Sequence, residues 1–132
     1  MLSSGTTKGI TLYTAAIQAL LDGNTFIIDE IENHFHKTLV ENLISIFKDK
    51  TVNKKGASLI FSTHYCELLD LFGRNDNIWI TKSVGKVLLT NMYKDYTIIN
   101  DLLKSKKVYE DNFGTAVSYD LLMNLKRELM IE

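Results

Sequence analysis

The chain has 132 residues, of which 45% are hydrophobic and 23% are charged, and this composition argues against a disordered protein. Fifteen basic residues stand against sixteen acidic ones, so no overall field would gather nucleic acid or an anionic membrane. The single cysteine cannot form an internal disulfide, and no apolar run approaches the roughly 18 residues that span a bilayer. We therefore expect one globular domain in the cytoplasm, with no membrane partner.

The first part of the chain predicts a helix followed by a strand. Apolar residues recur at helical spacing at Ile10, Tyr13, Ile17, Leu20 and Leu21. Gly23 and Asn24 then supply the turn expected just after a helix. Residues 25–29 form a short, nearly continuous apolar run with β-branched and aromatic side chains. This run predicts a strand that is buried on both faces, as in a parallel sheet.

A second helix and a second strand follow in the same order. Residues 36–48 predict a helix with one apolar face, formed by Leu39, Val40, Leu43 and Phe47. Residues 57–62 predict another short buried strand, and residues 65–71 a short helix. The order strand, helix, strand, helix indicates an α/β sheet, whose sites lie at the carboxyl ends of the parallel strands.

The remainder of the chain predicts a hairpin and then helices. Residues 77–82 and 86–90 flank a turn that contains Gly85, which is typical of a β-hairpin. The last predicted helix carries an apolar stripe of Leu121, Leu122, Leu125 and Leu129. We expect a single domain over residues 1–132, with an α/β part over 1–93 that bears the motifs and a helical tail over 94–132.

Two adjacent carboxylates, Asp29 and Glu30, end the first predicted strand. Side chains alternate along a strand, so the two acids are expected to point in different directions. One carboxylate can hold a hydrated Mg²⁺ through its waters, and its neighbour can accept a proton from an attacking water. The alternative interpretation is a strand that ends in two solvated acids.

The second predicted strand ends in Ser62, Thr63 and His64. A histidine at this point can donate a hydrogen bond to a γ-phosphate or orient the water beside it. One crossover separates the two strands, so we expect His64 near Glu30 at the same edge of the sheet. The alternative is a partly buried histidine that caps a loop.

A third motif, Leu2-Ser3-Ser4-Gly5-Thr6, comes immediately before the first predicted helix. Hydroxyl groups and free backbone N–H groups at a helix N-terminus favour an anion. A simple N-cap is the alternative interpretation of the same residues.

In this order, the three motifs resemble the catalytic half of ABC-type ATPases. The resemblance is to bacterial AAA-family ATP-binding proteins related to the structural-maintenance-of-chromosomes and overcoming-lysogenization-defect ATPases. It implies that residues 2–6 are the signature motif, that Asp29 and Glu30 end the Walker B strand, and that His64 is the switch histidine. Asp29 would then hold Mg²⁺ through water, Glu30 would act as the general base, and His64 would sense the γ-phosphate of ATP.

The resemblance also implies a fold and an assembly. The fold is that of the carboxyl-terminal half of a P-loop NTPase, with a mainly parallel sheet, a hairpin and carboxyl-terminal helices. In intact heads, ATP is sandwiched between two protomers of a homodimer. The residues of this chain that would contact the γ-phosphate in trans are Ser3, Ser4, Gly5 and Thr6. A nucleic acid or an effector nuclease is a further partner that the resemblance suggests.

No segment of the chain matches the P-loop pattern Gly-x-x-x-x-Gly-Lys-Ser/Thr. In the family the P-loop lies upstream of the signature motif, so we expect it before Met1, in an amino-terminal lobe that would be a partner of this chain. Catalysis of phosphoryl transfer is mostly positioning and electrostatic stabilisation. We therefore expect little or no ATP hydrolysis by the chain alone.

The sequence departs from the family pattern at three positions. Ser4 stands where transporters have a second glycine, and Thr6 stands where they have glutamine. Lys37 occupies the position of a proline after the Walker B strand. Residues 78–82 and 112–114, in contrast, resemble the last strand and the Phe-Gly pair of these heads.

Two other functions are open at this point. A metal-dependent hydrolase would use the crowded acids and histidines Asp29, Glu30, Glu32, His34 and His36, with His64 nearby. A non-catalytic interaction domain would expose the apolar stripe of the last predicted helix to a partner. A zinc titration compared with Mg-ATP separates the first alternative from an ATPase.

Overall fold

The computed structural model describes residues 4–83, 85–96, 104, 123–124 and 126–128. The chain divides into two compact units, Met1–Tyr65 and Cys66–Glu132, and each is described by itself. Within these described ranges, no helix combines the length and the apolar character that crossing a bilayer requires.

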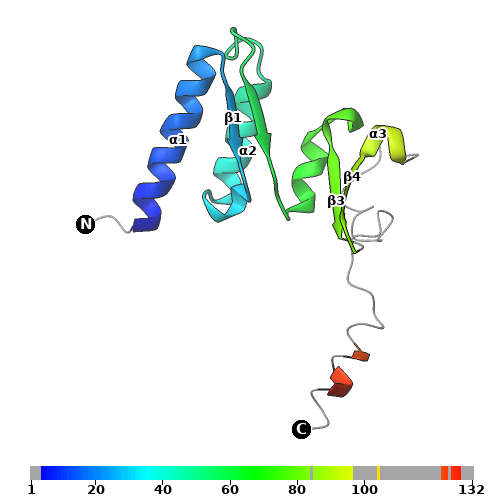
Figure 1. Ribbon diagram of the computed structural model, residues 1–132. Coiled ribbons are helices and arrows are strands. Elements are labelled where there is room, and N and C mark those ends of the chain that lie inside the picture. Colours follow the sequence, from blue (N-terminus) through cyan, green and yellow to red (C-terminus); the bar gives the residue numbers. More distant parts are fainter. Residues whose placement is uncertain (1–3, 84, 97–103, 105–122, 125, 129–132) are drawn as a thin grey trace. The chain divides into compact units, whose positions relative to one another are not determined.

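The first unit is a pair of parallel strands packed against two helices (Figure 1). Its elements are α1 (Ser4–Asp22), β1 (Thr25–Ile28), the 3₁₀ helix η1 (Ile31–Asn33), α2 (Lys37–Lys48) and β2 (Ser58–Phe61). The register places Thr25 opposite Ser58 and Ile28 opposite Phe61. The predicted parallel pair of strands, joined by a helical crossover, is confirmed.

The turn between α1 and β1 depends on Gly23. Its φ of 79° lies in the left-handed region, which glycine adopts without steric cost. A Cβ at this position would lie 2.8 Å from the Cβ of Lys55, so a larger residue would also collide with the α2–β2 loop. The turn reverses the chain, and α1 and β1 therefore run in opposite directions (Figure 1).

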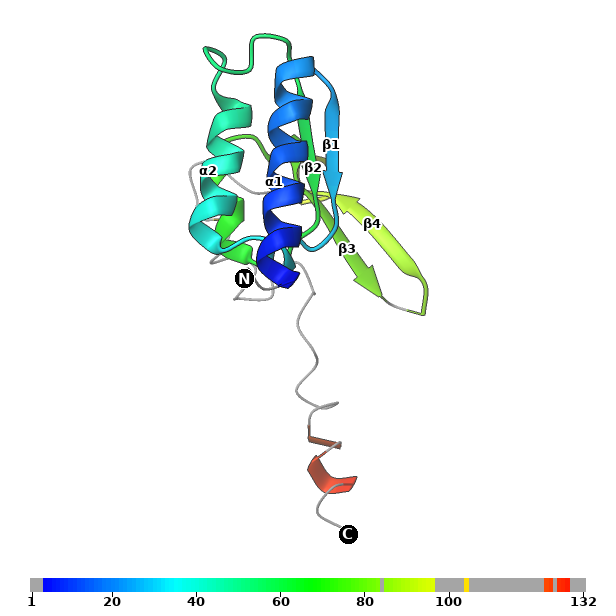
Figure 2. The same cartoon turned by 90° about the vertical axis from the view of Figure 1, so that its left-hand side faces the viewer.

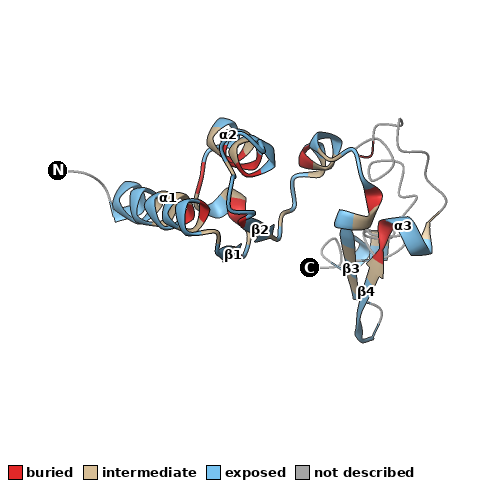
Figure 3. Cartoon of the chain, turned by 90° about the horizontal axis from the view of Figure 1, so that it is seen from above, coloured by how far each residue is buried: buried red, intermediate tan, exposed pale blue. Residues whose placement is uncertain are grey.

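The core of the first unit lies on one side of the sheet. Its buried apolar residues are Ala16, Leu20, Ile28, Ile31, Phe35, Val40, Leu43, Ile44, Phe47 and Ala57. Figure 3 shows that the buried parts of α1 and α2 are on their inward sides, while most of α1 is exposed. The predicted apolar face of α2 is confirmed at Val40, Leu43 and Phe47, and Leu39 is half-buried.

The prediction that the first strand is buried on both faces is wrong, and so is the predicted burial of the second strand. Ile27 is 70% exposed, and Ile60, its partner across the two strands, is 55% exposed. Alternate side chains point to opposite faces of a sheet, and α1 and α2 both pack on the same face (Figure 2). Phe26 and Ile28 face these helices, so only their face of β1 is covered.

The second unit contains an antiparallel hairpin. Its elements are the 3₁₀ helices η2 (Cys66–Leu71) and η3 (Asn75–Asn77), the strands β3 (Trp79–Ser83) and β4 (Val87–Asn91), and the short helix α3 (Met92–Asp95). The predicted hairpin is confirmed, with Trp79 opposite Asn91 and Ser83 opposite Val87. The short helix predicted after His64 is a 3₁₀ helix rather than an α-helix.

A small apolar core supports this hairpin. Ile78 and Met92 are buried, and the residues packed against them are Leu69, Phe72, Ile80 and Tyr96. Of the predicted helical tail over 94–132, the described residues are 94–96, 104, 123–124 and 126–128, and all of these except Tyr96 are helical. Its apolar stripe at Leu121, Leu122, Leu125 and Leu129, and the Phe-Gly pair within residues 112–114, lie outside the described residues.

Candidate functional site

The polar residues that follow β1 and β2 meet at one edge of the parallel pair. The backbone pairing continues beyond the strands, because Ser62 N–H donates to the carbonyl of Ile28 at 3.2 Å. Ile31 N–H in turn donates to the carbonyl of Ser62 at 3.1 Å. Residues 29–30 therefore lie directly beside residues 62–64, at what we call the carboxyl edge.

The hydroxyl of Ser62 connects the two acids of this edge. It donates a hydrogen bond to Oδ1 of Asp29, and it accepts one from the backbone N–H of Glu30 at 2.7 Å. Asp29 is exposed, so its carboxylate remains accessible to solvent while one of its oxygens is held. A hard carboxylate oxygen that is accessible in this way suits a hydrated Mg²⁺, which takes few protein ligands.

Glu30 and His64 form the second contact of the edge. Nε2 of His64 lies 3.3 Å from Oε1 of Glu30, and the other oxygen of Glu30 accepts a hydrogen bond from Nδ2 of Asn33 at 2.5 Å. The side chain of His64 is 80% exposed and that of Glu30 is 47% exposed. An exposed pair of this kind contributes little to folding stability, but a ligand can reach both of its members.

The backbone of Glu30 has an unusual conformation. Its φ of 45° and ψ of 64° lie in the left-handed region, and no other non-glycine residue in the described part of the chain has a positive φ. Such a conformation costs on the order of 1–3 kcal/mol and is concentrated at functional sites. The chain thus turns sharply between Asp29 and Glu30 instead of continuing the strand.

Glu32 holds the main chain of His64. Its Oε1 accepts a hydrogen bond from the backbone N–H of His64 at 2.6 Å. Burial alone would raise the pKa of Glu32, but this hydrogen bond, together with the hydroxyl of Thr63 and the nearby imidazole, lowers the pKa below its usual value. The acid that sequence crowding suggested as a metal ligand therefore acts as a support for His64.

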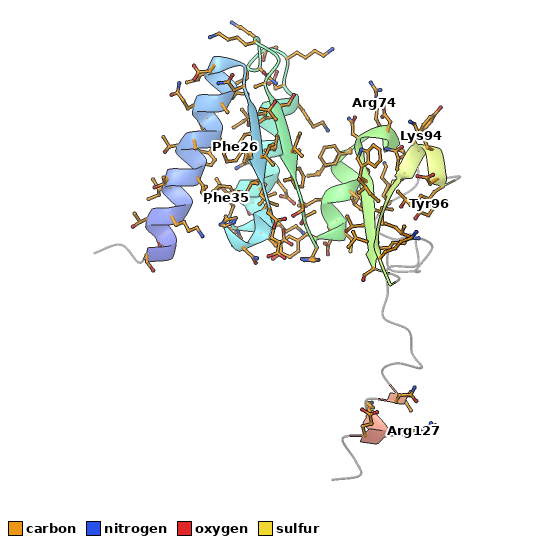
Figure 4. The ribbon with its side chains drawn as sticks, viewed as in Figure 1. Phe26, Phe35, Arg74, Lys94, Tyr96 and Arg127 are labelled. Carbon is orange, nitrogen blue, oxygen red and sulfur yellow. The ribbon has the colours of Figure 1, made fainter. Side chains whose placement is uncertain are left out.

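The turn that carries these groups is anchored in the core. Ile31 and Phe35 are both buried, and Phe35 N–H donates to the carbonyl of Ile31 at 3.1 Å. The ring of Phe35, labelled in Figure 4, meets Tyr13 of α1 edge to face with centroids 6.2 Å apart. The short helix η1 is therefore a fixed platform beneath an exposed site.

The opening motif is placed partly inside α1. Ser3 lies outside the described residues, while Ser4, Gly5 and Thr6 form the exposed first turn of the helix rather than the segment before it. Because α1 and β1 run in opposite directions, this turn lies at the same end of the unit as the carboxyl edge (Figures 1 and 2). The first N–H groups of a helix have no partner within the helix.

The histidines and acids that are crowded in the sequence do not come together as a ligand set. His36 is the exposed residue that precedes α2, and His34 is half-buried. Among the residues whose positions are described, no three His, Cys, Asp or Glu side chains are grouped so that they could hold a metal ion. A Mg²⁺ held mainly through water needs only one carboxylate, and the exposed carboxylate of Asp29 could serve in this way.

Comparison with known families gives one result. The family model described as "AAA domain, putative AbiEii toxin, Type IV TA system" matches residues 1–70, more than half of the chain. The chain belongs to this family of AAA domains. This membership supports a nucleotide-binding, ATPase-like function, and AAA-type ATPases generally use a nucleotide with Mg²⁺. No curated protein and no solved structure matches it.

The matched part of this AAA domain contains the whole carboxyl edge. It covers α1, both parallel strands and residues 62–64, whereas β3 and β4 lie beyond it. Reasoning from the sequence did not assign a role to Asn33, or to Ser62 as the link between the two acids. Asn33 follows Glu30 by three residues, and residues three apart lie on the same side of a 3₁₀ turn. This spacing is the signal that could have indicated the contact between Asn33 and Glu30.

Proposed function

We propose that this AAA domain binds Mg-ATP at the carboxyl edge and supports its hydrolysis in the manner of an ABC-type head. Asp29 would hold the hydrated Mg²⁺, Glu30 would be the general base, and His64 would contact the γ-phosphate. The observation that carries the proposal is the meeting of these three residues, from two strands, at one hydrogen-bonded and exposed edge. The left-handed backbone of Glu30 supports it, since strain of this kind is concentrated at functional sites.

The proposed chemistry uses the groups of the carboxyl edge. A water beside Oε1 of Glu30 would transfer a proton to the carboxylate while its oxygen attacks the γ-phosphorus, and the bond to the ADP oxygen would break. Mg²⁺, when bound, would neutralise the charge on the phosphate oxygens. Nε2 of His64 can donate either to Glu30 or to a phosphate oxygen. A bound nucleotide would therefore compete with Glu30 for this nitrogen.

The proposal includes a partner. Since the sequence has no P-loop pattern, the phosphate cradle would come from polypeptide outside these 132 residues. The signature residues Ser3, Ser4, Gly5 and Thr6 would act in trans, on ATP held by a second protomer. We expect weak nucleotide binding and little hydrolysis by the chain alone, because the P-loop and its lysine supply most of the phosphate contacts. A nucleic acid or an effector nuclease would be the further partner of the assembly.

A titration with Mg-ATP tests the proposal. In heteronuclear NMR spectra, Mg-ATP at millimolar concentration should shift the signals of residues 29–33 and 62–64. Asp29→Asn should weaken this binding roughly tenfold, which corresponds to about 1.4 kcal/mol. Asp49→Asn is the matched control, because Asp49 is an exposed acid in the loop at the other end of the same unit.

Two results would overturn the proposal. One is a Mg-ATP titration that leaves the signals of the carboxyl edge unchanged. The other is an equal loss of affinity in Asp29→Asn and Asp49→Asn, which would reduce the effect of Asp29 to general surface charge.

A further inference from the structure

Asn33 is bound to Glu30 twice. Its backbone N–H donates to the carbonyl of Glu30 at 2.9 Å, and its side-chain amide donates to Oε2 of Glu30 at 2.5 Å. The first hydrogen bond closes the turn around η1, and the second reaches from the end of that turn to the carboxylate. The two contacts together make Asn33 a clamp on one oxygen of Glu30.

The clamp fixes the orientation of the Glu30 carboxylate relative to His64. With Oε2 held by Asn33, Oε1 is the oxygen that lies 3.3 Å from Nε2 of His64. A half-exposed glutamate without such a contact would sample several rotamers, since its side chain has three rotatable bonds. Asn33 therefore selects one orientation of the carboxylate.

The position of Asn33 is itself fixed, although its side chain is exposed. It ends η1, which is attached to the core through the buried residues Ile31 and Phe35. Glu32, in the same turn, holds the main chain of His64. One turn thus places both the carboxylate and the imidazole of the carboxyl edge.

A neutral amide suits the charges around it. Asp29, Glu30 and Glu32 are all acidic, and an aspartate at position 33 would add a further negative charge and remove the donor. A lysine would supply a donor, but its positive charge would compete with Mg²⁺ and His64 for the carboxylates. Asparagine provides the hydrogen bond without either effect.

We propose that Asn33 is a positioning residue, which holds Oε2 of Glu30 so that Oε1 is presented toward His64 and the water to be activated. The catalytic meaning of this orientation rests on the proposed function, whereas the orientation itself does not. A group that is aligned in advance avoids the loss of freedom that would otherwise be part of the activation barrier. The residue acts through Glu30 and needs no contact with the nucleotide.

The test compares Asn33→Asp and Asn33→Ala with Asn42→Ala, which removes an exposed asparagine from α2. Asn33→Asp keeps nearly the same shape and the backbone hydrogen bond but replaces the amide donor with a carboxylate, whereas Asn33→Ala removes the donor without adding a charge. At one fixed pH, NMR signals of the Glu30 side chain and of the His64 ring should shift in both Asn33 variants. They should stay at their wild-type positions in Asn42→Ala, and far-UV circular dichroism should be unchanged in all three.

Mg-ATP titrations of the same samples separate this inference from the proposed function. Asn33→Ala, which removes the donor without adding a charge, should bind Mg-ATP within about threefold of wild type, but the shift that Mg-ATP produces at the His64 ring should be lost. Glu30 and His64 signals that remain at their wild-type positions in both Asn33 variants would overturn the role of Asn33. A wild-type chain that shows no response to Mg-ATP would instead overturn the proposed function.

Discussion

The helix-covered face of the parallel pair and its carboxyl edge use their residues in opposite ways. On the covered face, Ile28 and the buried side of α2 exclude water and contribute to the free energy of folding. At the edge, which begins one residue later, Asp29 and His64 are exposed and Glu30 has a strained backbone. The residues that stabilise the fold and those of the proposed site are therefore adjacent in the chain but distinct. Substitutions at the two places should separate the two properties.

The largest expected effect is on the covered face. Ile28→Ala should lower the free energy of unfolding by about 2–4 kcal/mol, because it leaves a cavity beneath the helices. Ile27→Ala, the same substitution at the neighbouring exposed position, should change it by less than about 1 kcal/mol. Urea unfolding curves of the two variants measure the difference. Equal losses would mean that the outer face of β1 is covered as well.

A smaller effect of opposite sign is expected at the edge. Glu30→Gly should raise the free energy of unfolding by up to about 1 kcal/mol, since glycine adopts a φ of 45° without steric cost. Glu41→Gly, in the helical backbone of α2, is the matched control and should lower it by about 1 kcal/mol. Thermal unfolding of both variants shows whether each substitution raises or lowers the free energy of unfolding. A loss of stability in Glu30→Gly would show that the contacts of its carboxylate outweigh the backbone strain.

The smallest effect concerns the support of His64 by Glu32. Because the pKa of Glu32 is lowered in the folded state, its carboxylate stabilises the fold above the usual value of 4.5. That contribution is lost as the pH falls through the lower, folded-state pKa. The stability difference between wild type and Glu32→Gln should therefore be constant near neutral pH and shrink below about pH 4.5. Urea denaturation at a series of pH values measures this difference. A stability difference that stays constant below pH 4.5 would contradict the role of the Glu32 carboxylate in supporting His64.

The order of elements could be predicted from the sequence, and the burial of the strands could not. Apolar periodicity and the β-branched run at residues 25–28 are local properties, and they indicated α1, β1 and the parallel pairing correctly. The exposure of Ile27 depends on which face the helices cover, which is a tertiary property that the run of apolar letters does not contain.

The same limit applies to the candidate site. The order of Asp29, Glu30 and His64 along two strands predicted that they would share one edge, because the carboxyl ends of parallel strands lie together. The left-handed conformation of Glu30 and the contact of Asn33 with its carboxylate belong to the turn that follows β1. No residue type in the sequence signals the left-handed turn, since glutamate is not a usual residue at positive φ.

The most direct test of the central claim is to locate the metal of a bound nucleotide. Mn²⁺ takes oxygen ligands as Mg²⁺ does, and in NMR spectra it broadens the signals of nuclei close to it. With Mn-ATP, the signals of residues 29–30 and 62–64 should broaden first, those of residues 49–56 at the other end of the unit should stay sharp, and Asp29→Asn should restore the broadened signals. Broadening that is uniform, centred elsewhere or unchanged in Asp29→Asn would contradict a metal–nucleotide site at the carboxyl edge.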